Sequence, residues 1–285
     1  MFINRMLRKC VKLYPFDKGR YKVMKFAENL LFPCNEVITD LHGKFYFKLE
    51  LSEKGLQSSF YYFLPNYYEV GTQRYLKEFV KPNMIVIDIG AHMGFYTLLF
   101  ASLVGQGGKA YSFEPAKRNF IHLKENVAIN DIYCVKLFQL ALSNKEGIVP
   151  LYLHPTENTG HSLINNEKAG LSVEEVQTTT LDNFIEQENI KNIDLIKIDA
   201  EGAEYSILKG AGKMLSGDNP PCIICEMPST KDTGKGNNVR EILYSHGYKS
   251  YCLEGGYLCE LDKKEPIEGL QNILYVKDSP DRKVA

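Results

Sequence analysis

From residue 84 onward, short apolar runs alternate with longer stretches in which apolar residues recur every three or four positions. The short runs predict strands, and their nearly uninterrupted apolar character is typical of strands covered on both faces. Seven strands are predicted: Met84–Ile89, Lys109–Phe113, Cys134–Leu142, Asp194–Asp199, Pro221–Met227, Lys249–Leu253 and Ile273–Val276. The periodic stretches predict helices over Tyr96–Val104, Arg118–Asn130, Ala203–Met214 and Val239–His246.

This order predicts an α/β sandwich with a mostly parallel, seven-stranded sheet and right-handed crossovers. The alternation is interrupted over about residues 147–181, where Gly147–Leu153 and Gln177–Leu181 have strand composition and Thr156–Ser162 is polar. A short helix is expected after this insertion, over Asp182–Glu188. Because loops at the top of a doubly wound sheet usually contact substrate, we expect the insertion to do so.

The first 80 residues have a different texture and are crowded with tyrosine and phenylalanine. Lys44–Leu49 predicts a strand, and Gly71–Phe79 predicts a helix that ends before Pro82. Met1–Arg20 mixes basic and apolar residues, so we expect a helix that packs on the protein, with contact to a membrane surface as the alternative. The chain therefore divides into an α+β extension, residues 1–80, able to cap the active site, and an α/β domain, residues 81–285.

The composition is that of a soluble globular protein, with 44% hydrophobic and 24% charged residues in a chain of 285. The net charge of -1 gives no electrostatic reason to expect a nucleic-acid partner. Signal-peptide and transmembrane patterns are both absent, so no stable membrane insertion is expected. Seven irregularly spaced cysteines, with Cys222 and Cys225 in a strand-like run, indicate free thiols in a reducing, cytoplasmic compartment. The oligomeric state stays open.

The first strand of the α/β region runs into a glycine-bearing turn, Ile87–Gly94, and then into a helix. Gly90 and Gly94 let the backbone approach a ligand closely, and Asp88 stands at the strand end. The second strand ends in Glu114, where a carboxylate can accept hydrogen bonds from both hydroxyls of a ribose. The G-x-G-x-x-G spacing that holds a pyrophosphate is absent. The combination predicts a nucleoside cofactor without phosphate, which is S-adenosylmethionine rather than NAD.

The fourth strand carries two charged residues in an apolar run. Lys197 and Asp199 share one side of the strand by its period of two, and Asp199 falls at the carboxyl end, beside the expected cofactor crevice. Such a pair can position or deprotonate a hydroxyl nucleophile. Glu201, in the following turn, is a further catalytic candidate, whereas Glu204 is expected to complement the helix N-terminus.

Histidines and metal ligands are weaker candidates. His161, in the polar loop of the insertion, is a possible catalytic base, and His92 in the glycine turn has a smaller claim. Asp199, Glu201 and Glu226 can be brought together on a metal, but no spacing demands it, so no metal is assigned.

Taken together, these motifs resemble the FkbM family of methyltransferases, over about Tyr68 to Met227. The matching stretches are Val86–Thr97, Phe113–Pro115, Asn126, Ala141–Ser143 before Gly147, Thr180–Asp182, Ile196–Glu204, Leu208–Ala211 and Glu226. The resemblance implies a Rossmann-like class I fold and methyl transfer from S-adenosylmethionine, typically to a hydroxyl of a polyketide-type product or a sugar.

The resemblance also implies roles for single residues. Asp88, Gly90, Gly94 and Thr97 are expected around the methionine part of the cofactor, Glu114 at the ribose, Ala141 and Leu142 at the adenine, and Glu69 facing the cofactor. The predicted cofactor contacts are completed by Ala91, Tyr96, Pro115, Asn119 and Asp199. His92 stands where the family commonly has Asn.

The sequence thus predicts an O-methyltransferase with a small-molecule or carbohydrate acceptor. An N- or protein methyltransferase and a non-catalytic cofactor-binding protein on the same fold remain alternatives. An NAD(P) oxidoreductase is disfavoured by the missing third glycine. The identity of the acceptor is not encoded in any motif found.

Overall fold

The computed structural model describes residues 2–14, 17–31, 37–51, 56–153, 163, 172–228, 235–253, 258–263 and 265–277. Its centre is an eight-stranded sheet with the strand order β12-β11-β13-β10-β9-β3-β4-β5. The strands are β3 (Ile85–Ile89), β4 (Lys109–Phe113), β5 (Val135–Phe138), β9 (Leu195–Ile198), β10 (Cys222–Met227), β11 (Tyr248–Cys252), β12 (Cys259–Leu261) and β13 (Gln271–Lys277). The five strands from β5 to β10 are parallel, and β13 runs antiparallel to both of its neighbours.

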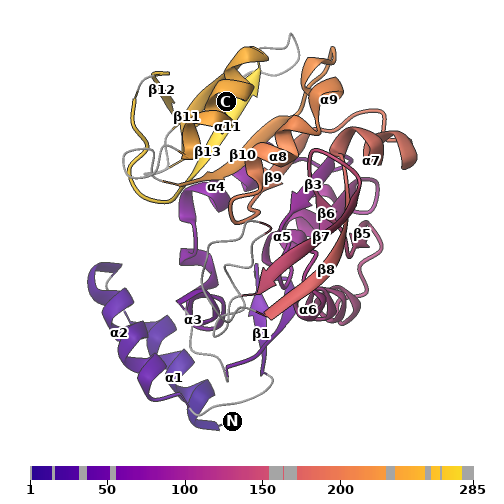
Figure 1. Ribbon diagram of the computed structural model, residues 1–285. Helices are drawn as coiled ribbons and strands as arrows, with labels where there is room; N and C mark the ends of the chain where they lie inside the picture. Colours follow the sequence, from indigo (N-terminus) through magenta and orange to yellow (C-terminus); the bar gives the residue numbers. More distant parts are fainter. Residues whose placement is uncertain are drawn as a thin grey trace.

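Helices cover both faces of this sheet (Figure 1). On β3, Val86 packs into one apolar core, whereas Ile87 and Ile89 pack into the other, because successive strand residues point to opposite faces. One core includes α4 (Val70–Phe79), α5 (Phe95–Val104) and α6 (Lys117–Ala128). The other includes α7 (Leu181–Gln187), α8 (Glu204–Lys209), α9 (Gly212–Ser216) and α11 (Lys235–Ser245). The predicted Rossmann-like α/β fold is confirmed.

Three details of the sequence prediction are wrong. The sheet has eight strands rather than seven, because β12 pairs with β11 at its edge. The third predicted strand stops at Phe138, opposite the last residue of β4, and Ala141–Leu142 then forms β6 in a second sheet. The helix predicted over Ala203–Met214 is broken at Gly210, where a Cβ would lie 2.2 Å from the carbonyl oxygen of Ser143.

The second sheet has the order β6-β8-β7 and belongs to the insertion. Its long hairpin pairs β7 (Gly147–Leu153) with β8 (Ser172–Thr179), which begins five residues before the predicted strand. The polar loop predicted over Thr156–Ser162 lies outside the described residues, as does His161.

The N-terminal extension consists of α1 (Phe2–Leu13), α2 (Asp17–Asn29), the hairpin of β1 (Val37–Leu41) and β2 (Phe45–Leu49), α3 (Leu56–Phe63) and the short η1 (Pro65–Tyr67). Figure 1 shows α1 and α2 at one end of the molecule, far from β11 and β12. Val11 of α1 is fully buried in the same core as α5. The predicted N-terminal helix is therefore present and packs on the protein through one face.

Two asparagines, Asn126 in α6 and Asn130 in the turn after it, attach the hairpin to the α/β domain. Asn126 accepts from the Lys48 backbone N–H (2.6 Å) and donates to the carbonyls of Lys48 (3.0 Å) and Met93 (2.9 Å). One turn later, Asn130 pairs in the same way with both backbone groups of Tyr46. The two side-chain amides thus take the place of a neighbouring strand along β2.

Cys222 and Cys225 are buried in β10, and the cysteines that the structure describes form no disulfide. Within the described ranges, every helix is too short or too polar to span a bilayer.

Candidate functional site

A pocket with about 710 Å³ of empty space, partly open to solvent, lies at the carboxyl ends of β3, β4 and β9. In an open α/β sheet this is where ligands bind, next to the point at which the strand order reverses. Here β4 and β5 follow β3 on one side, and β9 follows on the other. The lining includes eight of the predicted residues: Gly90, Glu114, Pro115, Asn119, Ala141, Leu142, Asp199 and Glu201.

Glu114 is the central polar group of this pocket and is 5% exposed. Its carboxylate accepts hydrogen bonds from the backbone N–H of His92 and of Ala116, both at 2.9 Å. Burial raises the pKa of Glu114 to about 7, although these N–H donors favour the ionised form. The glycine turn is therefore tied to the end of β4 through the side chain predicted to bind ribose.

The two glycines of the turn are required by the protein itself. A Cβ on Gly90, which has φ +82°, would lie 1.8 Å from the carbonyl oxygen of Asp199. A Cβ on Gly94, with φ +97°, would lie 2.8 Å from Leu123. Glycine thus lets β3 and the end of β9 approach closely, which brings Asp199 to the pocket.

Several predicted cofactor contacts do not line this pocket. Asp88 is 1% exposed, and its carboxylate lies 2.7 Å from the Thr97 hydroxyl, which in turn lies 3.0 Å from Ser112 Oγ. Burial raises the pKa of Asp88 to about 6, against the opposing charge of Lys197. The other predicted residues absent from the lining are Glu69, Ala91, Gly94, Tyr96 and Lys197.

Lys197 and Asp199 form the pair that the strand period predicts. The Lys197 ammonium lies 2.9 Å from Asp199 and 4.5 Å from the ring centre of Tyr96, and its side chain is 1% exposed. Burial disfavours the charge, but Asp199, Glu69 and Asp88 together raise the pKa of Lys197 above its ordinary value. The lysine is thus a fixed cation and not a proton acceptor.

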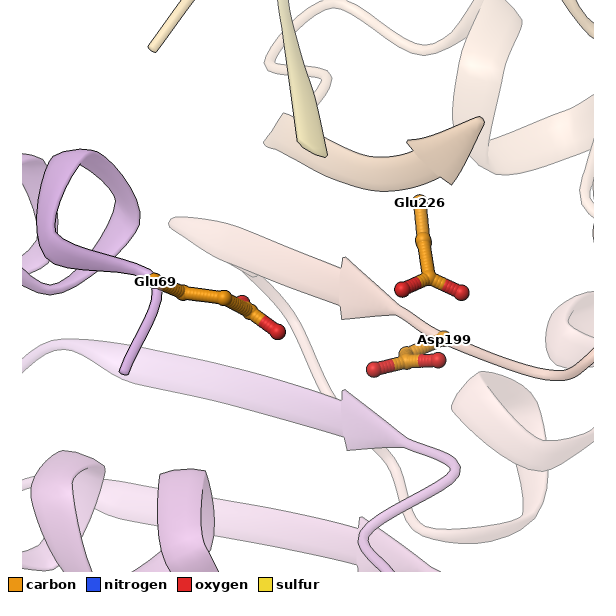
Figure 2. Close-up of side chains that lie close together, drawn as sticks. All are labelled: Glu69, Asp199 and Glu226. Carbon is orange, nitrogen blue, oxygen red and sulfur yellow. The ribbon is translucent and has the colours of Figure 1, made fainter. Parts of the chain in front are cut away.

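Asp199 also belongs to a cluster of three carboxylates with Glu69 and Glu226, whose oxygens lie within 4.8 Å of one another. Figure 2 shows the three side chains directed toward a common point from the start of α4 and the ends of β9 and β10. Burial and the charge of Asp199 raise the pKa of Glu226 to about 9, so Glu226 is neutral at pH 7. The three oxygens are of the type that binds a divalent cation, but Lys197 already supplies a positive charge there.

Glu69 enters the cluster by an unusual backbone conformation, with φ 42° and ψ 56° just before α4. Its carboxylate accepts from the Tyr96 hydroxyl and from the Asn272 amide, both at 2.6 Å. Burial and Glu69 raise the pKa of Tyr96 well above its ordinary value, which keeps the phenol protonated as a donor. The contact with Asn272 joins two segments 203 positions apart in the chain.

Two glutamates follow β9, Glu201 in the turn and Glu204 at the start of α8, and they differ in their surroundings. Glu204 accepts from the N–H of Ala200 and of Gly202, both at 3.0 Å, so it braces the turn at the start of α8. Glu201 is exposed, has φ 49° and lines the pocket. Glu204 thus holds the turn before α8 through two backbone N–H groups, in addition to the helix charge expected from the sequence, whereas the catalytic role of Glu201 stays a prediction.

Sequence reasoning missed the side chains that the extension places here. Gln57 of α3 lines the pocket, donates to the Tyr68 hydroxyl (3.1 Å), and has a buried Oε1 with no hydrogen-bond partner among the described residues. Tyr61 stacks on Phe95 with ring centres 4.6 Å apart. The crowding of aromatic residues was the available signal, but it has no motif spacing.

Comparisons with known proteins find methyltransferases. The methyltransferase FkbM domain matches residues 88–250. The chain is 29% identical to "Methyltransferase sdnD" of Sordaria araneosa, covering 45% of this chain and 60% of that protein. It is 27% identical to "2-O-methyltransferase NoeI" of Sinorhizobium fredii (strain NBRC 101917 / NGR234), covering 48% and 60%. The chain thus spans about 60% of the length of these curated relatives.

Among solved structures, methyltransferase FkbM from Methylobacillus flagellatus KT is 16% identical, with a TM-score of 0.44. The similarity covers 76% of this chain and 53% of that one.

Proposed function

Since the chain belongs to the FkbM methyltransferase family, we propose that it transfers the methyl group of S-adenosylmethionine to a hydroxyl of a small molecule or a sugar. Membership in the family supports methyltransferase activity and S-adenosylmethionine as the cofactor, both of which the sequence predicts. The observation that carries the proposal is the position of Asp199, which lines the cofactor pocket and also belongs to the carboxylate cluster.

The pocket residues fit this cofactor. Glu114 offers a carboxylate for a vicinal diol, and Leu142 and Ile207 offer apolar walls for a flat base. The unpartnered Oε1 of Gln57 is a buried acceptor that a ligand N–H or O–H can satisfy. When bound, S-adenosylmethionine supplies an electrophilic methyl group on a cationic sulfonium. We assign Asp199 and Glu201 to the side on which that positive charge is placed.

Asp199 is proposed as the proton acceptor of the reaction. When bound, S-adenosylmethionine would supply the methyl group to the acceptor oxygen, and the Asp199 carboxylate would take the hydroxyl proton. Lys197, 2.9 Å away, holds Asp199 in place by an ion pair. Because the Lys197 ammonium is buried and fixed, the charges around Asp199 need little reorganisation during the proton transfer.

An oxygen acceptor is favoured by the surroundings of the cluster. Asp199 and Glu69, together with neutral Glu226, offer both acceptors and a donor for hydroxyl groups. The relationship to a 2-O-methyltransferase supports the same choice. We further propose that the extension, residues 1–80, closes this side, because Gln57 and Glu69 reach the site from it.

The test has two parts. Equilibrium dialysis with S-adenosylmethionine, S-adenosylhomocysteine and NAD should give binding of the two adenosyl ligands and none of NAD. Transfer of labelled methyl groups should then be screened over matched alcohols, sugars and amines, with the product identified as ether or amine by mass spectrometry. Cofactor binding with methylation of amines alone would contradict the hydroxyl assignment. Absence of adenosyl ligand binding would remove the whole proposal.

A further inference from the structure

Helix α1 exposes an apolar stripe on the side that does not face the protein. Ile3, Met6 and Leu13 are 42%, 51% and 68% exposed, and Cys10 between them is exposed as well. Their spacing of three, four and three positions places them on one helix face. The opposite face holds Asn4 and Val11, which are buried against the rest of the chain. Helix α1 therefore has more apolar side chains than the described part of the protein covers.

A row of basic side chains runs beside this stripe. Arg5 and Lys9 are exposed and stand four positions apart, and Lys12 follows three positions later with an ion pair to Asp40 at 3.0 Å. Helix α2 adds exposed Phe26 at 66%. Large apolar and basic side chains thus alternate around the exposed part of these two helices.

The positive charge is concentrated in this part of the chain. Residues 1–31 contain eight Lys and Arg against two Asp and Glu, a net charge of +6, whereas the whole chain has -1. The remaining residues are therefore acidic as a group. A surface that combines exposed apolar side chains with one sign of charge is complementary to the headgroup region of an anionic bilayer.

We propose that α1 binds the surface of an anionic lipid bilayer, with Ile3, Met6 and Leu13 entering the headgroup region and Arg5 and Lys9 contacting acidic headgroups. A second copy of the chain is disfavoured as the occupant, because two such helices would repel each other by their charge. Nucleic acid is disfavoured because phosphate contacts do not use the apolar stripe. The inference is independent of the methyl-transfer proposal, since α1 contributes no side chain to the pocket.

The experiment is co-flotation of the full chain with vesicles of phosphatidylcholine alone or mixed with phosphatidylserine. We expect binding to the mixed vesicles that declines as salt is added. Arg5→Gln with Lys9→Gln should weaken it roughly 30-fold. Met6→Ser with Leu13→Ser should weaken it at least about tenfold. The matched control, Tyr133→Ser with Leu270→Ser, removes equally exposed apolar side chains elsewhere and should bind as the unchanged protein does.

Three results would overturn the proposal. The first is equal binding to both kinds of vesicle, and the second is a loss in the charge variant with none in the Met6 and Leu13 variant. The third is a stripe-dependent dimer in light scattering, which would make the face a contact between two copies. Far-ultraviolet circular dichroism and thermal unfolding, measured on each variant, verify that the chain is folded.

Discussion

The cofactor pocket and the carboxylate cluster meet at Asp199 but are built in different ways. The pocket is formed by loops that directly follow adjacent parallel strands, and its central side chain, Glu114, is held by backbone N–H groups. The cluster is assembled from the extension, β9, β10 and β13, and it is held by contacts between side chains. Local chain geometry thus defines the first region, and long-range packing of charges defines the second.

The difference has an electrostatic consequence. The pocket contains one buried carboxylate near its titration point, with a pKa of about 7. The cluster holds three carboxylates near a buried ammonium, and burial together with the charge of Asp199 raises the pKa of one of them, Glu226, to about 9. We therefore expect changes in the pocket to alter cofactor affinity and changes in the cluster to alter turnover.

The largest effect is expected at Asp199. Asp199→Asn removes the proposed proton acceptor and should lower kcat by about 100- to 10,000-fold, with little change in S-adenosylhomocysteine affinity. Steady-state kinetics with the acceptor identified by the methyl screen, together with dialysis, measure the two quantities. Asp218→Asn, which makes the same change at an exposed aspartate outside the pocket, is the matched control and should keep the activity. If Asp199→Asn lowered both S-adenosylhomocysteine affinity and kcat by similar factors, cofactor binding and turnover would not be separated between the pocket and the cluster.

Asn126 joins the two regions, because its amide contacts the extension at Lys48 and the glycine turn at Met93. Asn126→Ala should lower the free energy of unfolding by about 2–4 kcal/mol, since three hydrogen bonds of a fully buried amide are lost. Urea unfolding followed by circular dichroism measures this. Asn130→Ala, which removes the exposed hydrogen bonds to Tyr46 of the same strand β2, should lower the free energy of unfolding by a smaller amount. An equal loss of unfolding free energy in both variants would show that the buried hydrogen bond from Asn126 to the Met93 carbonyl adds no stability.

Glu114 tests the pocket by itself. Glu114→Gln should weaken S-adenosylhomocysteine binding by about 10- to 100-fold, because an amide has one acceptor oxygen where the carboxylate has two. At saturating cofactor, kcat should change little. Calorimetric titration supplies the affinity, with Glu174→Gln, a carboxylate that accepts from Lys117 N–H at the surface, as the control. A normal affinity in Glu114→Gln would remove this residue from the ribose assignment.

The pH dependence of cofactor binding follows from the same residue. The pKa of Glu114 is about 7 in the folded protein, so the carboxyl is protonated below that pH and ionised above it. Since the ionised form accepts hydrogen bonds from both ribose hydroxyls, affinity should rise up to about tenfold per pH unit below 7 and level off above it. Titrations across this range should give a flat profile for Glu114→Gln. A slope that persists in the variant would point to Asp88, whose pKa is about 6.

The smallest effect is expected at Glu226, although it lies beside Asp199. Its pKa of about 9 means that the carboxyl is neutral at pH 7, as a glutamine is. Glu226→Gln should therefore change kcat less than about twofold at neutral pH. A large loss of kcat would show that turnover needs the ionised carboxylate of Glu226, and that this residue carries a negative charge in the cluster.

The sequence by itself determined the strands of the sheet, the glycine turn and Glu114, because each depends on neighbouring residues and on strand periodicity. It also paired Lys197 with Asp199, since a strand turns every second side chain to the same face. It divided neither the third strand at Phe138 nor the helix at Gly210, because a strand ends where its partner ends and a glycine breaks a helix where another segment packs against it.

Tertiary structure alone decided the carboxylate cluster. Glu69 meets Asn272 and Glu226 across most of the chain, and Gln57 reaches the pocket from the extension. No spacing in the sequence encodes such contacts, because they depend on how the extension packs on α5 and α6. The charge states follow from the same packing: Lys197 is charged and Glu226 is neutral because of their burial and neighbours, and neither property belongs to the residue type.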